Sequence, residues 1–199
     1  MNYLAHAYLS LNQRDILTGN MISDFVKGKK QYDYPLMIQK GIRLHRLIDA
    51  FTDAHPATGE IKKYFKPDYR LYAGAFTDIV YDYFLANDPN EFSSVNDLEA
   101  FTLLTYEELE TNASYFPEQF LYMFPYMKMQ NWLYNYLYES GIEKSFSGMA
   151  RRAKYIPETG KAFSIFRDNT PSMKIYYDDF FPLLKQYTVY TLEQLLNAD

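Results

Sequence analysis

The chain of 199 residues contains no cysteine, a single tryptophan and only three histidines. The lack of cysteine excludes a disulfide scaffold, a thiol nucleophile and metal ligation by thiolate, and it fits a reducing compartment. No segment approaches the roughly 20 apolar residues that span a bilayer, and no basic segment followed by an apolar run marks secretion. We therefore expect a cytoplasmic protein with no membrane partner.

Strand signals are also missing, because no alternating pattern bounded by hairpin turns occurs. The sequence instead predicts a long amphipathic helix over 35–55, opened by Pro35, since the missing N–H of proline costs nothing at a helix start. We expect further helices at 15–27, 56–65, 70–87, 95–113, 117–139, 142–153, 158–168 and 172–197, with Pro125 and Pro182 as kinks or breaks. Residues 1–11 fit either a short helix or an extended segment. No repeat or linker divides the chain, so the expected fold is one all-α, compact multi-helix domain over residues 1–199.

Aromatic residues become dense after residue 115. They include Tyr115, Phe116, Phe120, Tyr122, Phe124, Tyr126, Trp132, Tyr134, Tyr136 and Tyr138. Aromatic residues at helical spacing usually form core and helix contacts rather than a cofactor site. We therefore expect this segment to be structural.

The net charge of -5 is unevenly distributed. Residues 1–86 sum to +2 and residues 87–199 to -7, and the acidic total disfavours duplex nucleic acid as a partner. The first half nevertheless carries many basic residues, namely Lys27, Lys29, Lys30, Arg43, Arg46, Lys62, Lys63 and Arg70. These fit either a solvated mixed surface or the binding of an anionic substrate or partner.

All three histidines lie in the first 55 positions, and a group of aspartates accompanies them: His6, His45 and His55, with Asp24, Asp49, Asp53, Asp78 and Asp82. Imidazole nitrogen and carboxylate oxygen both suit a hard or borderline divalent cation. At about 100° of rotation per helical residue, His45 and Asp49 share one apolar face and Asp78 and Asp82 share another. On a third helix, Asp24 falls beside Leu17, Asn20 and Met21. We therefore expect three helices to present carboxylates on buried faces.

Two explanations compete for these carboxylates. An unpaired buried carboxylate costs several kcal/mol, so each must be paired, protonated or bound to metal. Taken singly, each aspartate is as readily a helix cap or salt-bridge partner as a ligand. Three converging sites together favour a metal centre. His6 is weaker evidence, because a single inward histidine is often only a core residue, and His55 before Pro56 fits a helix C-terminal cap better than a ligand.

Six segments stand in a specific order and spacing. They are Asn2-x-Leu4-Ala5-His6, Gly19 to Gly28, Gly41 to Asp49, Phe51 to Pro56, Arg70 to Leu85 and Gly148 to Arg152. They resemble the acyl carrier protein phosphodiesterase family, densely over residues 2–86 and thinly beyond residue 90. The resemblance implies an all-helical fold akin to HD-domain phosphohydrolases, a divalent cation, typically Mn²⁺ but with Mg²⁺ or another open, and a place in fatty acid biosynthesis and lipid metabolism. It implies hydrolysis of the phosphodiester that joins 4′-phosphopantetheine to a serine of holo-acyl carrier protein.

The resemblance also carries over particular positions. The family's His and Asp signatures fall on His6, Asp24, His45, Asp49, Asp78 and Asp82. We expect His6, Asp24, His45 and Asp78 to bind the metal and Asp49 or Asp82 to act on the attacking water. Arg46 or Arg43 is expected to hold a phosphate oxygen. The chain has no His-Asp dipeptide, so any metal site must be built differently from that of the wider HD group, for example from His45 and Asp49.

The expected partner, an acyl carrier protein, is acidic. The cations that would dock it are Lys27, Lys29, Lys30, Arg70, Arg151 and Arg152, and complementary charge mainly raises the encounter rate. For Arg151 and Arg152, a helix-end pair that complements the dipole is an equal alternative. Two other functions stay open: a metal-dependent phosphohydrolase acting on a nucleotide or other small phosphoester, and a non-enzymatic helical binding module whose aspartates form buried salt bridges.

Overall fold

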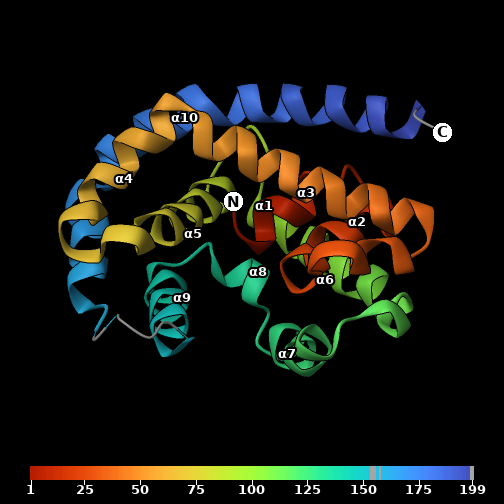
Figure 1. Ribbon diagram of the computed structural model, residues 1–199. Coiled ribbons are helices and arrows are strands. Elements are labelled where there is room, and N and C mark those ends of the chain that lie inside the picture. The colour runs from red at the N-terminus through yellow and green to blue at the C-terminus, as the bar shows by residue number, and fades with distance from the viewer. Residues whose placement is uncertain (153–155, 157, 198–199) are drawn as a thin grey trace.

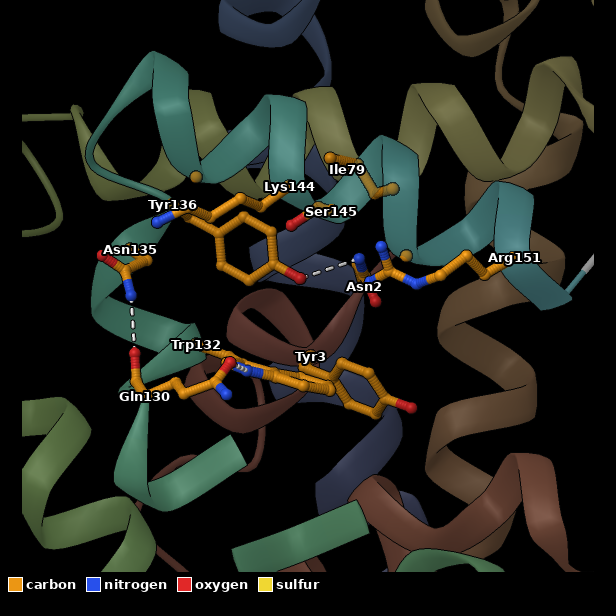
Figure 2. Close-up of a pocket in the computed structure, with 12 residues that line it drawn as sticks. Asn2, Tyr3, Ile79, Gln130, Trp132, Asn135, Tyr136, Lys144, Ser145 and Arg151 are labelled. Carbon is orange, nitrogen blue, oxygen red and sulfur yellow. Dashed lines mark hydrogen bonds between the residues drawn. The ribbon is translucent and has the colours of Figure 1, made fainter. Parts of the chain in front are cut away.

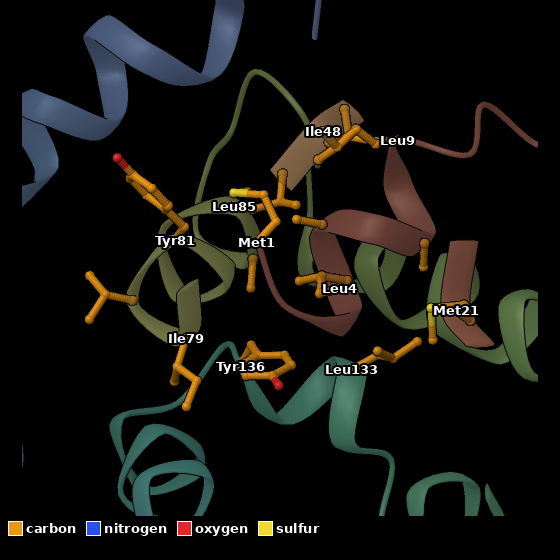
Figure 3. Packing of buried hydrophobic residues seen from close by; sticks show 14 of the residues in the cluster. Met1, Leu4, Leu9, Met21, Ile48, Ile79, Tyr81, Leu85, Leu133 and Tyr136 are labelled. Atoms are coloured by element: carbon orange, nitrogen blue, oxygen red, sulfur yellow. The ribbon is translucent and has the colours of Figure 1, made fainter. Parts of the chain in front are cut away.

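The N-terminal helix α1 (Tyr3–Tyr8) lies at the centre of the molecule in the computed structural model, which describes residues 1–152, 156 and 158–197 (Figure 1). Its Leu4 and Ala5 are fully buried, as is Leu9 just beyond it. Figure 3 shows Met1 and Leu4 among side chains from α5 and the α8 region. The first residues of the chain are therefore part of the core, and α1 settles the choice between a helix and an extended segment.

Every regular element of the described residues is helical, which confirms the expected all-α domain. The N-terminal half contains α2 (Arg14–Ile22), η1 (Ser23–Phe25), η2 (Gly28–Asp33), α3 (Leu36–Ala54), α4 (Pro56–Tyr69), η3 (Arg70–Tyr72) and α5 (Ala73–Ala86). The C-terminal half contains α6 (Val95–Thr111), η4 (Ala113–Tyr115), α7 (Glu118–Met129), α8 (Trp132–Asn135), α9 (Glu139–Arg152) and α10 (Gly160–Asn197). Among the described residues no helix combines the length and apolar character needed to cross a bilayer.

The C-terminal helix α10 packs against α3, α4, α5 and α9 and runs along one side of the molecule (Figure 1). The expectation of two helices at 158–168 and 172–197 was wrong, because α10 continues through both Pro171 and Pro182. Proline removes one helical hydrogen bond and bends a helix. The buried apolar face nevertheless continues past both positions, through Phe166, Met173 and Leu184, so tertiary packing keeps α10 intact.

The expected helix at 117–139 was also wrong as one element. It is divided into α7 and α8 at Asn131, whose φ of 43° is left-handed. Asparagine tolerates this conformation better than most residues. Pro125, expected as a kink or break, lies inside α7. The helix expected at 15–27 ends at Ile22, where η1 begins.

Helices α2 and α3 approach each other unusually closely, at a pair of glycines. A Cβ atom on Gly19 would lie 2.1 Å from the carbonyl oxygen of Ile38, and one on Gly41 would lie 2.3 Å from that of Ile16. Both obstacles are backbone, so no side chain can move aside. This contact sets the position of α2 relative to α3, and with it the distance between Asn20 and His45.

We expect Gly41→Ala to lower the free energy of unfolding by about 3 kcal/mol, because the added methyl group forces two packed backbones apart. Gly59→Ala is the matched control, since Gly59 is helical and a Cβ there meets nothing within 4 Å. That control should gain about 0.5–1 kcal/mol from helix propensity. Urea unfolding followed by circular dichroism measures both. Equal stability of the two variants would contradict the close crossing.

Candidate active site

The rings of His6 and His45 stack face to face at the centre of the N-terminal half. Their centroids lie 3.8 Å apart and their planes differ by 13°. His6 comes from α1 and His45 from α3, and both side chains are almost fully buried. Two of the three histidines therefore share one site, as the sequence analysis expected.

Asn20 of α2 orients both rings. Its backbone carbonyl oxygen lies 2.7 Å from His45 Nδ1, and its side-chain Oδ1 lies 2.8 Å from His6 Nδ1. Its Nδ2 donates to the His6 carbonyl and to Ser10 Oγ, so Oδ1 must be the acceptor for His6. Each Nδ1 therefore carries a proton, and each neutral ring has its lone pair on Nε2.

Aspartate oxygens surround the two Nε2 atoms. Asp49 Oδ1 lies 3.2 Å from His6 Nε2, and its Oδ2 lies 3.1 Å from His45 Nε2. Asp24 Oδ1 lies 3.3 Å from the same His45 nitrogen. Despite these distances, neither buried Nε2 makes a well-directed hydrogen bond to any atom of the described residues. His6, His45 and Asp49 thus form a cluster whose ligand atoms all lie within 4.8 Å of one another, and a divalent cation fits this donor set.

Asp78 of α5 joins the edge of this cluster. The Met1 amino nitrogen lies 3.0 Å from Asp78 Oδ1 and 3.3 Å from Asp49 Oδ1. The two carboxylates therefore converge on one point that favours positive charge. The side chain of Asp78 is 30% exposed and that of Asp24 is 70% exposed, so the carboxylate side of the site is open to solvent and the imidazole side is closed.

The two stacked histidines titrate in opposite directions. Burial and the neighbouring His45 lower the pKa of His6 to about 4. Burial alone would also lower the pKa of His45, but Asp24 and Asp49 raise it to about 9. In the absence of metal, His45 is therefore protonated at neutral pH and His6 is not.

The carboxylates also separate into two kinds. The adjacent His45 lowers the pKa of Asp24, and although burial opposes them, His45 and His6 hold the pKa of Asp49 well below its usual range. Burial raises the pKa of Asp78 despite the nearby amino group. Asp78 is thus the better proton acceptor of the three carboxylates.

Asp82, expected as a catalytic base, is used instead to hold α1. Its carboxylate accepts hydrogen bonds from the backbone N–H groups of Asn2, Leu4 and Ala5, at 3.3, 2.8 and 3.2 Å. The side chain is fully buried, and burial raises its pKa to about 7 although these bonds oppose the change. Asp82 therefore caps α1 and so positions His6. More than 70 residues separate it from α1 along the chain.

Asp53 and His55, which accompany the other histidines and aspartates in the sequence, lie outside the cluster. Asp53 is exposed, and its Oδ1 lies 2.7 Å from Lys62 Nζ. His55 ends α3, but its Nδ1 accepts a hydrogen bond from Ala57 N at 3.3 Å. Its side chain therefore caps the start of α4 rather than the end of α3.

The candidate phosphate-binding arginine is tied to a neighbouring segment. Arg46 donates to Gln31 Oε1 at 2.8 Å and to the Val26 carbonyl at 3.1 Å. These contacts fix the segment that follows Asp24. Arg46 is exposed, so its guanidinium lies at the surface beside the site rather than within the cluster.

The expected docking cations fall into three groups. Lys27, Lys29 and Lys30 are exposed at and beside η2. Arg70 lines a depression of about 450 Å³ with Lys62, Lys63 and Lys66. Arg151 lines a different cavity, and the side chain of Arg152 lies outside the described residues.

That second cavity has a volume of about 530 Å³ and lies between α1, α5, α8 and α9 (Figure 2). It begins at Asn2 and Ile79, which neighbour Met1 and Asp78 in sequence. Trp132 and Tyr136 line it, whereas this aromatic segment was expected to be structural. Asn20 was also missed as a functional residue. The available signal was a polar residue beside Gly19 on an otherwise apolar helix face.

Fold and cluster together define the class of the protein: an all-helical domain in which buried imidazoles and part-exposed carboxylates meet beside a surface cavity, as in enzyme active sites. A family model described as acyl carrier protein phosphodiesterase matches residues 1–184. The chain belongs to that family and is a phosphoric diester hydrolase.

Curated relatives of this name match along most of the chain. The protein from Photorhabdus laumondii is 32% identical over 199 residues, covering 100% of this chain and 97% of the relative. Those from Escherichia coli O6:H1 and Yersinia pestis are 29% and 28% identical, covering 89% and 92% of this chain and 89% and 95% of the relatives. No solved structure matches the chain.

We expect Asp82→Ala to lower the free energy of unfolding by about 3 kcal/mol, because three backbone N–H groups lose their acceptor. Asp82→Asn should cost less, since one acceptor oxygen remains. Ser94→Ala removes the side-chain cap of α6 and should lower the free energy of unfolding by about 1 kcal/mol, which is the reference value for a single cap. Chemical unfolding of the three variants gives the order. A loss for Asp82→Ala no larger than that for Ser94→Ala would contradict the cap on α1.

Proposed function

We propose that this protein hydrolyses the phosphodiester between 4′-phosphopantetheine and the serine of holo-acyl carrier protein, with a divalent cation, most suitably Mn²⁺, held by His6, His45 and Asp49. The family name and the names of the relatives support the substrate. The cluster of two imidazoles and a carboxylate supports the cation. Such an enzyme acts in lipid metabolism, in the cytoplasm.

One observation carries the metal proposal. Both Nε2 atoms are buried, both rings donate through Nδ1 to Asn20, and neither Nε2 makes a well-directed hydrogen bond within the described part of the chain. A buried polar atom without a partner is costly. A histidine that binds metal through one ring nitrogen typically donates a hydrogen bond from the other, which fixes the tautomer. The donor set therefore fits a cation better than a structural salt-bridge network.

The proposed roles follow from position and exposure. The bound cation would lower the pKa of a water molecule and neutralise charge on the phosphoryl oxygens. Asp24 lies beside His45 and can complete the ligand set. Asp78, with its raised pKa and partial exposure, is placed to accept the proton of the attacking water.

The charge around the site supports an acidic protein as the substrate. The depression lined by Lys62, Lys63, Lys66 and Arg70 also includes Asp53 and Gly74, which lie one helical turn from Asp49 and Asp78. Leu71 beside it is 97% exposed. A basic surface with an apolar centre, next to the cluster, suits an acidic carrier, and its long-range attraction would raise the encounter rate.

Binding of Mn²⁺ should release one proton per site at pH 7. His45, with a pKa of about 9, must lose its proton to become a ligand, whereas His6, with a pKa of about 4, is already neutral. The apparent affinity should therefore rise about tenfold per pH unit between pH 6 and 8. Isothermal titration calorimetry in buffers of different ionisation enthalpy measures both quantities.

In the same calorimetry, Asp49→Asn should weaken Mn²⁺ binding by at least about tenfold, because one anionic donor of the site is lost. Asp53→Asn, one helical turn further along α3 and exposed, serves as the matched control. Binding that is independent of pH, or equal loss in the two variants, would count against this site.

Incubation of the protein and Mn²⁺ with holo-acyl carrier protein should reduce the mass of the carrier by that of phosphopantetheine less one water, since hydrolysis returns the serine hydroxyl. Asp78→Asn should lower kcat by about 10²-fold or more through loss of the proton acceptor, with Mn²⁺ affinity retained. Salt should slow cleavage of the carrier more than cleavage of bis(p-nitrophenyl) phosphate, since only the carrier is steered by charge. Mass spectrometry and steady-state kinetics provide the measurements.

An unchanged carrier mass together with rapid cleavage of nucleotides or other small phosphoesters would replace the carrier by a small substrate. No hydrolysis of either class with any divalent metal would end the proposal.

A further inference from the structure

The cavity between α1, α5, α8 and α9 has no role in the cluster, yet it starts beside it. Ile79 follows Asp78 on α5, and Asn2 follows Met1, whose nitrogen touches Asp78 and Asp49. Asn2 Nδ2 donates to Tyr136 Oη at 2.9 Å, which fixes one wall (Figure 2). Residues of the cavity lining therefore adjoin the cluster in sequence on two separate elements, at the start of α1 and on α5.

The lining combines flat apolar surfaces with uncharged polar groups. In Figure 2, Trp132 and Tyr3 lie on one side and Lys144 and Ser145 of α9 on the other, with the ring of Tyr136 between them. Amides of Gln130 and Asn135 add further donors and acceptors. Lys144 and Arg151, seven residues apart on α9, supply positive charge. A cavity of about 530 Å³ lies in the range of small-molecule sites and is too small to take a protein helix.

We propose that this cavity holds the pantetheine arm of the substrate, an inference that rests on the proposed function. Pantetheine is a narrow chain with a dimethyl group and methylene segments, a hydroxyl group and two secondary amides. Its apolar segments match the aromatic walls, and its amides and hydroxyl match the amide and hydroxyl side chains. Arg151, whose guanidinium lies beside Asn2 in Figure 2, favours the phosphorylated end. The arm is recognised here, and the carrier remains outside on the basic depression.

Trp132 provides a direct test, because it is the single tryptophan of the chain and lines the cavity. Metal-free protein titrated with pantetheine or 4′-phosphopantetheine should show a saturable change in fluorescence, and glycerol phosphate should show none. An equal response to glycerol phosphate would mean a simple anion site and would overturn the inference.

Gly148→Leu fills the cavity with little strain, since a Cβ at Gly148 meets only Arg151 Nη2, at 3.6 Å. We expect at least tenfold weaker pantetheine binding and at least tenfold lower kcat/KM for holo-carrier. Cleavage of bis(p-nitrophenyl) phosphate should stay within twofold of the wild type. Ala100→Leu, at an exposed position of α6 outside both this cavity and the basic depression, is the control and should bind pantetheine normally.

Arg151→Glu is a second, exposed variant that does not depend on tolerance of a larger side chain. It should weaken binding of 4′-phosphopantetheine at least fivefold and leave binding of unphosphorylated pantetheine unchanged. If the wild type binds pantetheine but does not cleave holo-carrier, the proposed function fails and the cavity assignment stands. If holo-carrier is cleaved while Trp132 shows no response and Gly148→Leu is fully active, the cavity assignment alone fails.

Discussion

The close contact of α2 and α3 at Gly19 and Gly41 is the constraint on which the site depends. It brings the backbone of Asn20, next to Gly19, within hydrogen-bond distance of His45, one turn beyond Gly41. The side chain of the same asparagine reaches His6. One residue thus fixes the tautomer and the direction of two rings from different helices, and any larger residue at the crossing would separate Asn20 from His45.

The short helix α1 depends on a partner far away in sequence. A helix of six residues is not stable alone, and α1 begins without a side-chain cap of its own. Asp82 supplies three hydrogen bonds to its N-terminal end, and buried apolar contacts of Leu4 and Ala5 complete its support. The position of His6 therefore follows from α5, and the charge buried at Asp82 serves geometry rather than proton transfer.

Helical periodicity predicted which residues face inward, but it could not predict their partners. It placed His45 and Asp49 on one face correctly, but the expectation of a buried helix face for Asp24 was wrong, because α2 ends at Ile22 and Asp24 is exposed in η1. It could not distinguish Asp78, at the edge of the cluster, from Asp82, one turn away, because both share a face and only the location of α1 separates them. The sequence did not single out Asn20 for the same reason. Its role depends on contacts with His6 and His45, which belong to two other helices. The continuation of α10 through two prolines likewise depends on packing against α3, α4, α5 and α9.

Two surfaces of different chemistry adjoin the cluster, and the proposed function divides recognition of a carrier between them. The depression beside Asp53 and Gly74 is basic and open, whereas the cavity beside Asn2 and Ile79 is lined by aromatic and amide groups. A phosphodiester bridges the same two chemistries, since one side is an acidic protein and the other a neutral, flexible chain. Residues of both linings neighbour the cluster in sequence, so each half of such a substrate would have a matching surface when the phosphorus atom is at the carboxylates. In the proposed complex, simultaneous contact of both halves would orient the phosphodiester at the carboxylates.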